Sequence, residues 1–399
     1  MARIIDPIKT MKIVLLTVPP SSGSQSMPRF ARLIGEGMRE RGHQVEYMTS
    51  GDLCSARSSI LPRWLRKWSA YADQYLLFPR VLREKVATAP RDTLFVVTDQ
   101  GLGMWVPPVS GRPHVIHCHD LLAIRSALGE FPENPTGFSG RIYQRMILSG
   151  LKQGGNFISV SEATCESLTR LLGIPGGISE VVPNALNRPV DRLDPREAAA
   201  LLGNSPVRED RRPILHVGGN QWYKNRLGVL RLYERYARST RDPRPLCMAG
   251  APPEKQLISY YERMDCRELV TFVTGLNDAE LDAYYSLASL LLHPSLEEGF
   301  GWPVAEAQAH GCPVITTGIP PMTEVGGASA FYIPRMPVSG EIRHWLDEGA
   351  DMIKKVLELP QQEREERIRT GLVNASRFDR ESFLDACESF YRKILRTSA

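Results

Sequence analysis

Several familiar patterns are missing from this 399-residue chain. Its seven cysteines are scattered and never form a Cys-x2-Cys pair, which argues against a disulfide framework and for reduced thiols in a cytosol-like compartment. The apolar run at residues 13–18 is too short for a signal core or a membrane span, so we expect no segment to cross a membrane. No Asp-x-Asp triplet occurs, so a metal clamp of that kind has no evident ligands.

A large excess of charge of one sign is also missing. The formal net charge is +4, which is too small to argue for a nucleic-acid partner but is compatible with anionic ligands or a membrane surface. A hydrophobic content of 42% and a charged content of 24% are those of a soluble globular protein. A chain of this length predicts two domains, each able to bury its own core.

Short apolar runs that end in turns and lead into helical patterns predict an α/β fold with parallel sheets. The turn after the first run lacks Gly-x-Gly-x-x-Gly, so a dinucleotide-binding fingerprint is not supported. A segment rich in proline and charge, residues 188–212, reads as a linker. We therefore predict an N-terminal domain at residues 1–187, a second domain at 188–380 and a final helix at about 381–399. The expected strands lie at residues 12–18, 44–48, 94–98, 114–118, 157–160, 214–217, 246–250, 270–274, 290–293 and 313–317.

The stretch Pro294 to Pro313 combines a glycine turn, a helix and two carboxylates. Gly299 and Gly301 open a helix expected at residues 305–310, and the free N–H groups of a first helical turn form a site for phosphate or another anion. Glu298 precedes the turn, and a carboxylate there can accept hydrogen bonds from sugar hydroxyls beside that phosphate. The alternative is that Glu298 and Glu306 are solvated surface positions.

The pair Glu298-x7-Glu306 around Gly-Phe-Gly resembles the pattern of glycosyltransferase family 4, retaining enzymes of the two-domain GT-B fold. The resemblance implies two Rossmann-like domains that face an interdomain cleft, with the C-terminal helix crossing back to the N-terminal domain. It also implies that Glu298 holds the donor hexose and that Glu306 holds the ribose of the nucleotide. Gly299, Phe300 and Gly301 would then line the donor site.

A second strand, glycine turn and helix surround Lys224. A diphosphate at this turn would meet backbone N–H groups and a fixed cation together. By resemblance Lys224 is the lysine that binds the donor diphosphate, with Asn220 beside it. The family often has arginine where Gly219 stands, and we expect Arg226 to supply the missing cation. The alternative is a surface lysine at the start of a helix.

The resemblance assigns further residues. His119 follows the strand at residues 114–118, where open α/β sheets bind ligands, and corresponds to a histidine at the donor sugar. His117 and His119 should share one face, but no third and fourth ligand with closed spacing supports zinc. Gly275 would meet the nucleobase through its backbone. The loop containing Ser22, Gly23 and Ser24 is a candidate for acceptor or phosphate contact, or a plain turn.

The resemblance implies a retaining hexosyltransferase, and the lack of an Asp-x-Asp triplet favours one that needs no metal and no cofactor. Its donor would be a UDP- or GDP-linked sugar, and its acceptor a hydroxyl of a glycan or lipid-linked glycan, as in surface polysaccharide synthesis. The alternatives are a GT-B nucleotide-sugar epimerase and a non-catalytic sugar-nucleotide binding protein. A phosphorylase of the glycogen type would need a longer chain, and a nucleic-acid binder would need a basic stripe where the acidic pair lies.

The stretch from Arg63 to Arg91 carries seven Lys or Arg residues against two acidic ones, with aromatic residues at helical spacing. One interpretation is a helix that packs its aromatic stripe, Trp64, Trp68, Tyr71 and Tyr75, into the N-terminal domain. The other is reversible attachment of a cytoplasmic protein to the anionic inner face of a membrane, where a lipid-linked acceptor would be available.

Overall fold

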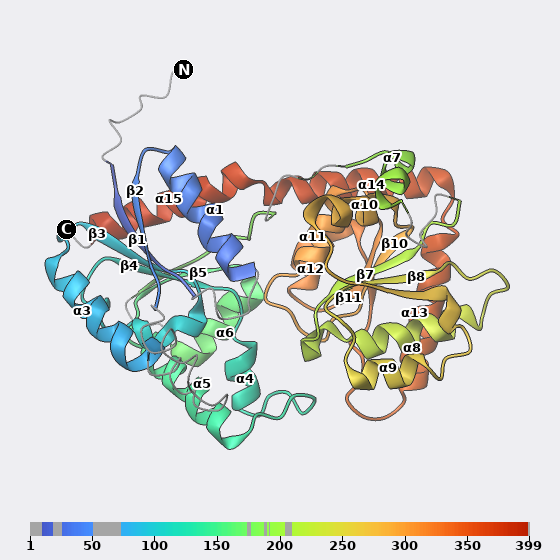
Figure 1. The fold of residues 1–399 in the computed structure, drawn as a ribbon, viewed down its shortest axis with the longest axis horizontal. Helices are drawn as coiled ribbons and strands as arrows, with labels where there is room; N and C mark the ends of the chain where they lie inside the picture. The colour runs from blue at the N-terminus through green and yellow to red at the C-terminus, as the bar shows by residue number, and fades with distance from the viewer. Residues whose placement is uncertain are drawn as a thin grey trace, which may run out of the picture. The chain divides into compact units, whose positions relative to one another are not determined.

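The computed structural model describes residues 10–18, 26–50, 73–173, 177–186, 190, 192–203 and 210–397. The chain forms two compact units (Figure 1). Unit 1 comprises Met1–Glu130, Pro135–Pro183 and Arg380–Ala399, and unit 2 comprises Phe131–Asn134 and Asn184–Asp379. Each unit holds one six-stranded parallel sheet with helices around it, which confirms the predicted α/β class.

The sheet of unit 1 has the strand order β2-β1-β3-β4-β5-β6. Its central strands are buried along nearly their whole length, because helices cover both faces, and this explains their continuous apolar sequences. The strands are β1 (Lys12–Leu16), β2 (Gln44–Met48), β3 (Thr93–Val97), β4 (His114–Cys118), β5 (Asn156–Ser159) and β6 (Ile178–Val181). The helices are α1 (Ser26–Glu40), η3 (Asp73–Leu77), α3 (Phe78–Thr88), η4 (Gln100–Trp105), α4 (Leu122–Ala127), α5 (Phe138–Leu151), α6 (Glu162–Leu172) and α15 (Arg380–Thr397).

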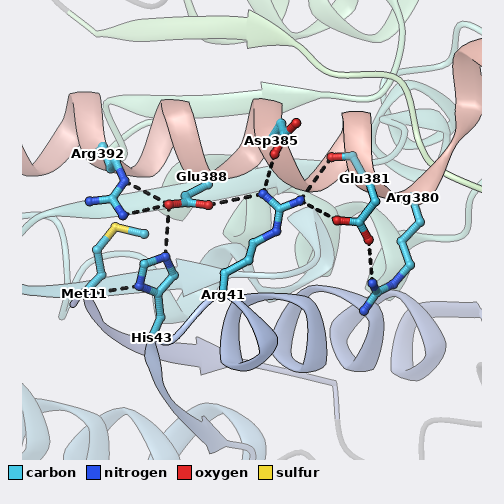
Figure 2. A network of polar contacts seen from close by, with 8 residues as sticks. All are labelled: Met11, Arg41, His43, Arg380, Glu381, Asp385, Glu388 and Arg392. Atoms are coloured by element: carbon cyan, nitrogen blue, oxygen red, sulfur yellow. Dashed lines mark hydrogen bonds and ion pairs between the residues drawn. The ribbon is translucent and has the colours of Figure 1, made fainter. Parts of the chain in front are cut away.

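The last helix, α15, belongs to unit 1. Its apolar face is buried, and Leu384 fits against Gly37 of α1, where an added Cβ would approach its side chain to 2.4 Å. Figure 2 shows Arg41, directly after α1, among three carboxylates of α15, those of Glu381, Asp385 and Glu388. Apolar packing and this ion cluster therefore hold α15 against α1.

The sheet of unit 2 has the strand order β12-β11-β10-β7-β8-β9. Strand β7 lies between β10 and β8. The next strands along the chain, β8 and β9, extend the sheet on one side of β7, and β10, β11 and β12 extend it on the other side. The strands are β7 (Ile214–Gly218), β8 (Leu246–Gly250), β9 (Val270–Val273), β10 (Leu290–His293), β11 (Val314–Thr317) and β12 (Phe331–Ile333).

The helices of unit 2 include α7 (Pro195–Leu202), which was not predicted from the sequence. Residues 188–212 were expected to be a linker, but Pro195–Leu202 forms α7. Asp194 caps this helix, its side chain accepting from Arg196 N–H at 2.9 Å while Glu197 completes a capping box. The linker prediction rested on the content of proline and charge, but proline is favoured in the first helical turn, where Pro195 stands. The other helices are η5 (Trp222–Lys224), α8 (Arg226–Ala237), α9 (Lys255–Tyr261), η6 (Arg267–Leu269), α10 (Asp278–Leu287), α11 (Trp302–Ala309), α12 (Met322–Gly326), η7 (Gly327–Ser329), α13 (Ile342–Leu357), α14 (Gln361–Ala375) and η8 (Ser376–Phe378).

Candidate functional site

The candidate site of unit 2 lies where its strand order reverses. Strands β7 and β10 are neighbours in the sheet but not in the sequence, and parallel α/β sheets bind ligands outside the carboxyl ends of such strands. The loop after β7 carries Lys224, and the loop after β10 carries Glu298. The topology therefore brings together two residues that are 74 positions apart.

Lys224 and Glu298 form a buried ion pair. The lysine Nζ donates to the Oε1 atom of Glu298 at 2.7 Å, and the two side chains are only 14% and 6% exposed. The same Oε1 atom accepts a hydrogen bond from Ser295 Oγ at 2.8 Å and lies 3.1 Å from His293 Nε2. One carboxylate oxygen thus has three polar partners, which fix its position.

These partners determine the charge of the site. Burial alone would raise the pKa of Glu298, but the positive charge of Lys224 and the hydrogen bond from His293 lower this pKa to about 2. Burial lowers the pKa of His293, so its imidazole is neutral near pH 7 and its Nε2–H donates to the carboxylate. At neutral pH the site therefore contains an ionised carboxylate, an ammonium group and a neutral imidazole.

The glycine turn next to Glu298 opens α11 as predicted, although the helix begins at Trp302 rather than at residue 305. Gly301 is its N-cap and has a φ of 101°, which favours glycine, and a Cβ at this position would meet no atom within 4 Å. Phe300 is buried, and its ring packs edge-on against Phe378 at 5.3 Å. The space beside Gly301 is therefore open, whereas the Phe300 side chain serves the core of unit 2.

Glu306 lies on α11, one turn beyond the start of the helix, and is half-buried. Its Oε2 atom accepts a hydrogen bond from Tyr285 Oη at 2.8 Å. The Tyr285 ring stacks on His310 at 5.2 Å, and His310 Nε2 lies 2.6 Å from Asp282 Oδ1. Contacts from α10 therefore hold the Glu306 carboxylate in place, and this support was not predicted from the sequence.

Arg226 and Asn220 connect the loop after β7 to the loop after β8. The Arg226 guanidinium donates to Asn220 Oδ1 and to the carbonyl of Ala251, and Asn220 Nδ2 donates to the carbonyl of Pro252 at 2.9 Å. Both residues line a pocket of about 230 Å³ together with Trp222 and other residues of unit 2. Gly275 follows β9 with a φ of 72° and open space at its Cβ position.

His119 lies in unit 1 and is buried. Its Nε2 atom is 3.0 Å from the carbonyl oxygen of Thr98, and this nitrogen therefore carries the proton. Burial lowers the pKa of His119 to about 4, so the ring is neutral at pH 7. Phe30 makes edge-on contacts with both His117 and His119, which confirms that the two histidines share one face.

Two groups of predicted residues fall partly or wholly outside the described part of the chain. Ser22, Gly23 and Ser24 do so, as does the first part of the basic stretch, residues 63–72. Of the described aromatic residues, Tyr75 packs edge-on against Tyr143 at 5.6 Å, and Phe78 lies 4.2 Å from Trp105. These two contacts agree with the interpretation that the aromatic side chains of this stretch pack inside the N-terminal domain.

His293 and Ser295, which contact Glu298, were not predicted from the sequence as site residues. The rule that singled out His119, a polar residue at the carboxyl end of a parallel strand, applies equally to His293, the last residue of β10. Arg335 was not predicted either; its Nη2 atom lies 2.8 Å from Glu133 Oε1, and its Nε donates to the carbonyl of Leu296 at 3.0 Å. Arg335 thereby holds the loop that carries Glu298.

Among the described residues, no group of three or more His, Cys, Asp or Glu side chains is arranged to hold a metal ion. No helix in the described part of the chain has the length and apolar character needed to span a bilayer.

Comparison with known proteins identifies the fold. Residues 27–188 match the family model described as Glycosyltransferase Family 4, and residues 201–330 match the model described as Glycosyl transferases group 1. The structure is similar to an α,α-trehalose-phosphate synthase (UDP-forming) from Burkholderia vietnamiensis, with a TM-score of 0.69, 13% identity and coverage of 98% of this chain and 99% of that one. The chain has the GT-B fold of the glycosyltransferases. The predicted GT-B fold class is thereby confirmed.

Two curated relatives of this GT-B chain are O-antigen chain mannosyltransferases. One, from Salmonella typhimurium, is 40% identical over 70 residues, which cover 18% of this chain and 20% of the relative. The other, from Escherichia coli, is 25% identical over 218 residues, which cover 53% of this chain and 56% of the relative. The matches therefore span about a fifth and about half of the lengths of these relatives.

Proposed function

We propose that this GT-B protein is a retaining glycosyltransferase that moves a hexose from a UDP- or GDP-linked sugar to a hydroxyl group. The observation that carries the proposal is the buried Lys224–Glu298 pair at the strand reversal of unit 2, beside the open turn at Gly301. A cation and the backbone N–H groups at the start of a helix suit a diphosphate, whereas a carboxylate suits sugar hydroxyls. Both matched family models describe glycosyltransferases.

In this mechanism the bond between the anomeric carbon and the β-phosphate oxygen breaks while the acceptor oxygen bonds to that carbon on the same face. The acceptor proton passes to the departing phosphate. Lys224 and the N–H groups near Gly301 stabilise the negative charge that grows on this phosphate. Glu298 positions the hexose through its hydroxyls, and His119 is a further residue proposed for the sugar. No metal and no cofactor takes part.

The other donor contacts are assigned by the same reasoning. Glu306 is the proposed ligand of the ribose hydroxyls, because its carboxylate is already oriented by Tyr285. The buried guanidinium of Arg226 is proposed as the second cation for the diphosphate. The backbone at Gly275 would contact the base.

The proposed acceptor is a glycan or lipid-linked glycan of a surface polysaccharide. The names of the two mannosyltransferase relatives support it, because an O-antigen chain is such a polysaccharide. A protein working on a lipid-linked glycan would act at the inner face of a membrane, and the basic stretch from Arg63 to Arg91 is one proposed contact with that surface.

A thermal-shift panel tests the donor site. UDP, GDP, ADP and their sugars would each be added to the protein, since a ligand at 100 times its Kd contributes about 2.7 kcal/mol of apparent stability. We expect UDP or GDP to raise the melting temperature, and Lys224→Met to abolish the rise. Lys354→Met is the matched control, because Lys354 lies on α13 of the same unit, 4.0 Å from an exposed partner. Flat responses to all nucleotides would contradict the proposal.

Two activity assays separate the two remaining alternatives from a transferase. An epimerase would change UDP-linked N-acetylglucosamine without any acceptor, which NMR of the nucleotide sugar detects. A non-catalytic binding protein would respond to the nucleotide sugar but release no nucleotide with any acceptor supplied.

A further inference from the structure

Helix α5 of unit 1 has one face committed to the protein core. Ile147, Gly150 and Leu151 are buried, and α5 packs on η4. The contact is close, because a Cβ on Gly150 would approach the carbonyl oxygen of Gly103 to 2.1 Å. This packing fixes which side of α5 points away from the sheet.

The opposite face of α5 exposes large apolar side chains. Phe138, Ile142 and Met146 are 81%, 44% and 50% exposed. Their spacing of four residues places them in one stripe along the helix. Isolated exposed apolar residues are common on protein surfaces, but three in register on one helix form a continuous patch that fits an apolar partner.

The charged residues of α5 itself are all positive. Arg141 and Arg145 are exposed and lie one turn apart on α5, and the exposed Lys152 follows the helix. No Asp or Glu occurs from residue 134 to residue 161, although the whole chain has 45 acidic residues in 399, about one in nine. The surface therefore combines an apolar stripe with a cationic border.

We propose that the exposed face of α5 docks the protein onto an anionic lipid bilayer. Apolar side chains at the boundary between headgroups and acyl chains, with arginine and lysine at the level of anionic headgroups, are the features of a helix that lies in a membrane interface. The lack of acidic residues favours a lipid surface over a second copy of this face, since two such borders would repel each other. Figure 1 shows α5 at the lower edge of unit 1.

This surface consists of α5 side chains, and it adds a membrane contact to the proposed transferase. Its test involves no sugar transfer. The vesicle experiment therefore tests the α5 proposal separately from the proposed transfer activity, and either proposal can be refuted while the other stands.

The test is flotation of the full-length protein with vesicles of phosphatidylcholine alone, or with about one third phosphatidylglycerol. We expect binding to the anionic vesicles at low salt and weaker binding at raised salt, because ions screen exposed charges. The double variant Phe138→Ser/Ile142→Ser should bind at least about tenfold more weakly, as should Arg141→Gln/Arg145→Gln.

Matched controls lie on α14 of unit 2. Val373 is 68% exposed, and the Arg369 side chain is 70% exposed, so Val373→Ser and Arg369→Gln each replace an exposed side chain by the same type of residue elsewhere on the surface. We expect these controls to bind as the parent does, and all variants to keep the parent's melting temperature. Parent-like vesicle binding by both α5 variants would overturn the proposal. So would a dimer of the parent that only the α5 variants dissociate, because a second copy would then cover this face.

Discussion

Replacing Lys224 with methionine tests the energetics of the site most directly. The substitution keeps the length of the side chain but removes the cation 2.7 Å from Glu298, whose side chain is 6% exposed. Glu298 would keep its contacts with His293 and Ser295, but neither carries a compensating charge at neutral pH. Removing one partner of a buried ion pair typically costs about 3–5 kcal/mol.

The pKa of Glu298 gives a similar magnitude. A value of about 2 in the folded protein, against an ordinary value of 4.5, corresponds to about 3 kcal/mol of stabilisation. Because the folded-state pKa is lowered, this stabilisation is present above pH 4.5 and is lost as the pH falls through 2. Without Lys224, burial raises the pKa of Glu298 instead, so the destabilisation should be largest near pH 8 and shrink toward pH 5.

The assay is urea unfolding of the parent, Lys224→Met, Glu298→Gln and the double variant at pH 5 and pH 8. We expect the double variant to lose less stability than the sum of the single variants, because the buried charge is then removed together with its partner. Lys354→Met should cost less than about 1 kcal/mol, since its partner Asp351 is 78% exposed and the two atoms lie 4.0 Å apart. Equal, pH-independent losses for Lys224→Met and Lys354→Met would refute the reasoning.

Four further predictions concern activity and folding. Glu298→Gln should reduce transfer at least about 100-fold while nucleotide affinity changes little, because the carboxylate contacts the sugar and not the phosphate; equal losses in both would place Glu298 at the nucleotide. His119→Ala should reduce transfer while the far-ultraviolet circular dichroism stays that of the parent, whereas an unfolded variant would assign His119 a purely structural role. Transfer should persist in EDTA, and proton NMR of the first-formed product should show the anomeric configuration of the donor; an inverted product would remove the assignment to a retaining family. Arg41→Gln should lower stability by about 1–2 kcal/mol, less at raised salt, because two of its three carboxylate partners are largely exposed, and unfolding curves at two salt concentrations would show it.

The sequence predicted the α/β class because parallel strands buried on both faces leave continuous apolar runs such as residues 12–16 and 93–97. It could not give the strand order, which depends on contacts between segments far apart in the chain. The segment Phe131–Asn134 shows this limit, since it lies between two segments of unit 1 but belongs to unit 2. Glu133 reaches Arg335 through tertiary structure alone.

The candidate site was partly predictable for a similar reason. Lys224 and Glu298 stand in local patterns of strand, glycine turn and helix, and such patterns can be read from a single segment. That the two side chains form an ion pair depends on β7 and β10 being neighbours, which no local pattern reports. His293 and Ser295 were missed because their importance comes from the carboxylate that they contact.

The ion pair also bears on how the proposed donor would bind. A buried carboxylate needs a positive partner to stay ionised, and in this structure Lys224 provides it. The same ammonium group would have to approach a donor diphosphate, which carries more negative charge than Glu298. Ser295 and His293 contact Glu298 Oε1 independently of Lys224, so the carboxylate would keep its position if Lys224 turned partly toward the phosphate. Sugar hydroxyls would then replace the hydrogen bond that the lysine gives up. His293 and Ser295, which fix the position of Glu298 in this structure, are therefore the side chains that would orient it toward the donor sugar.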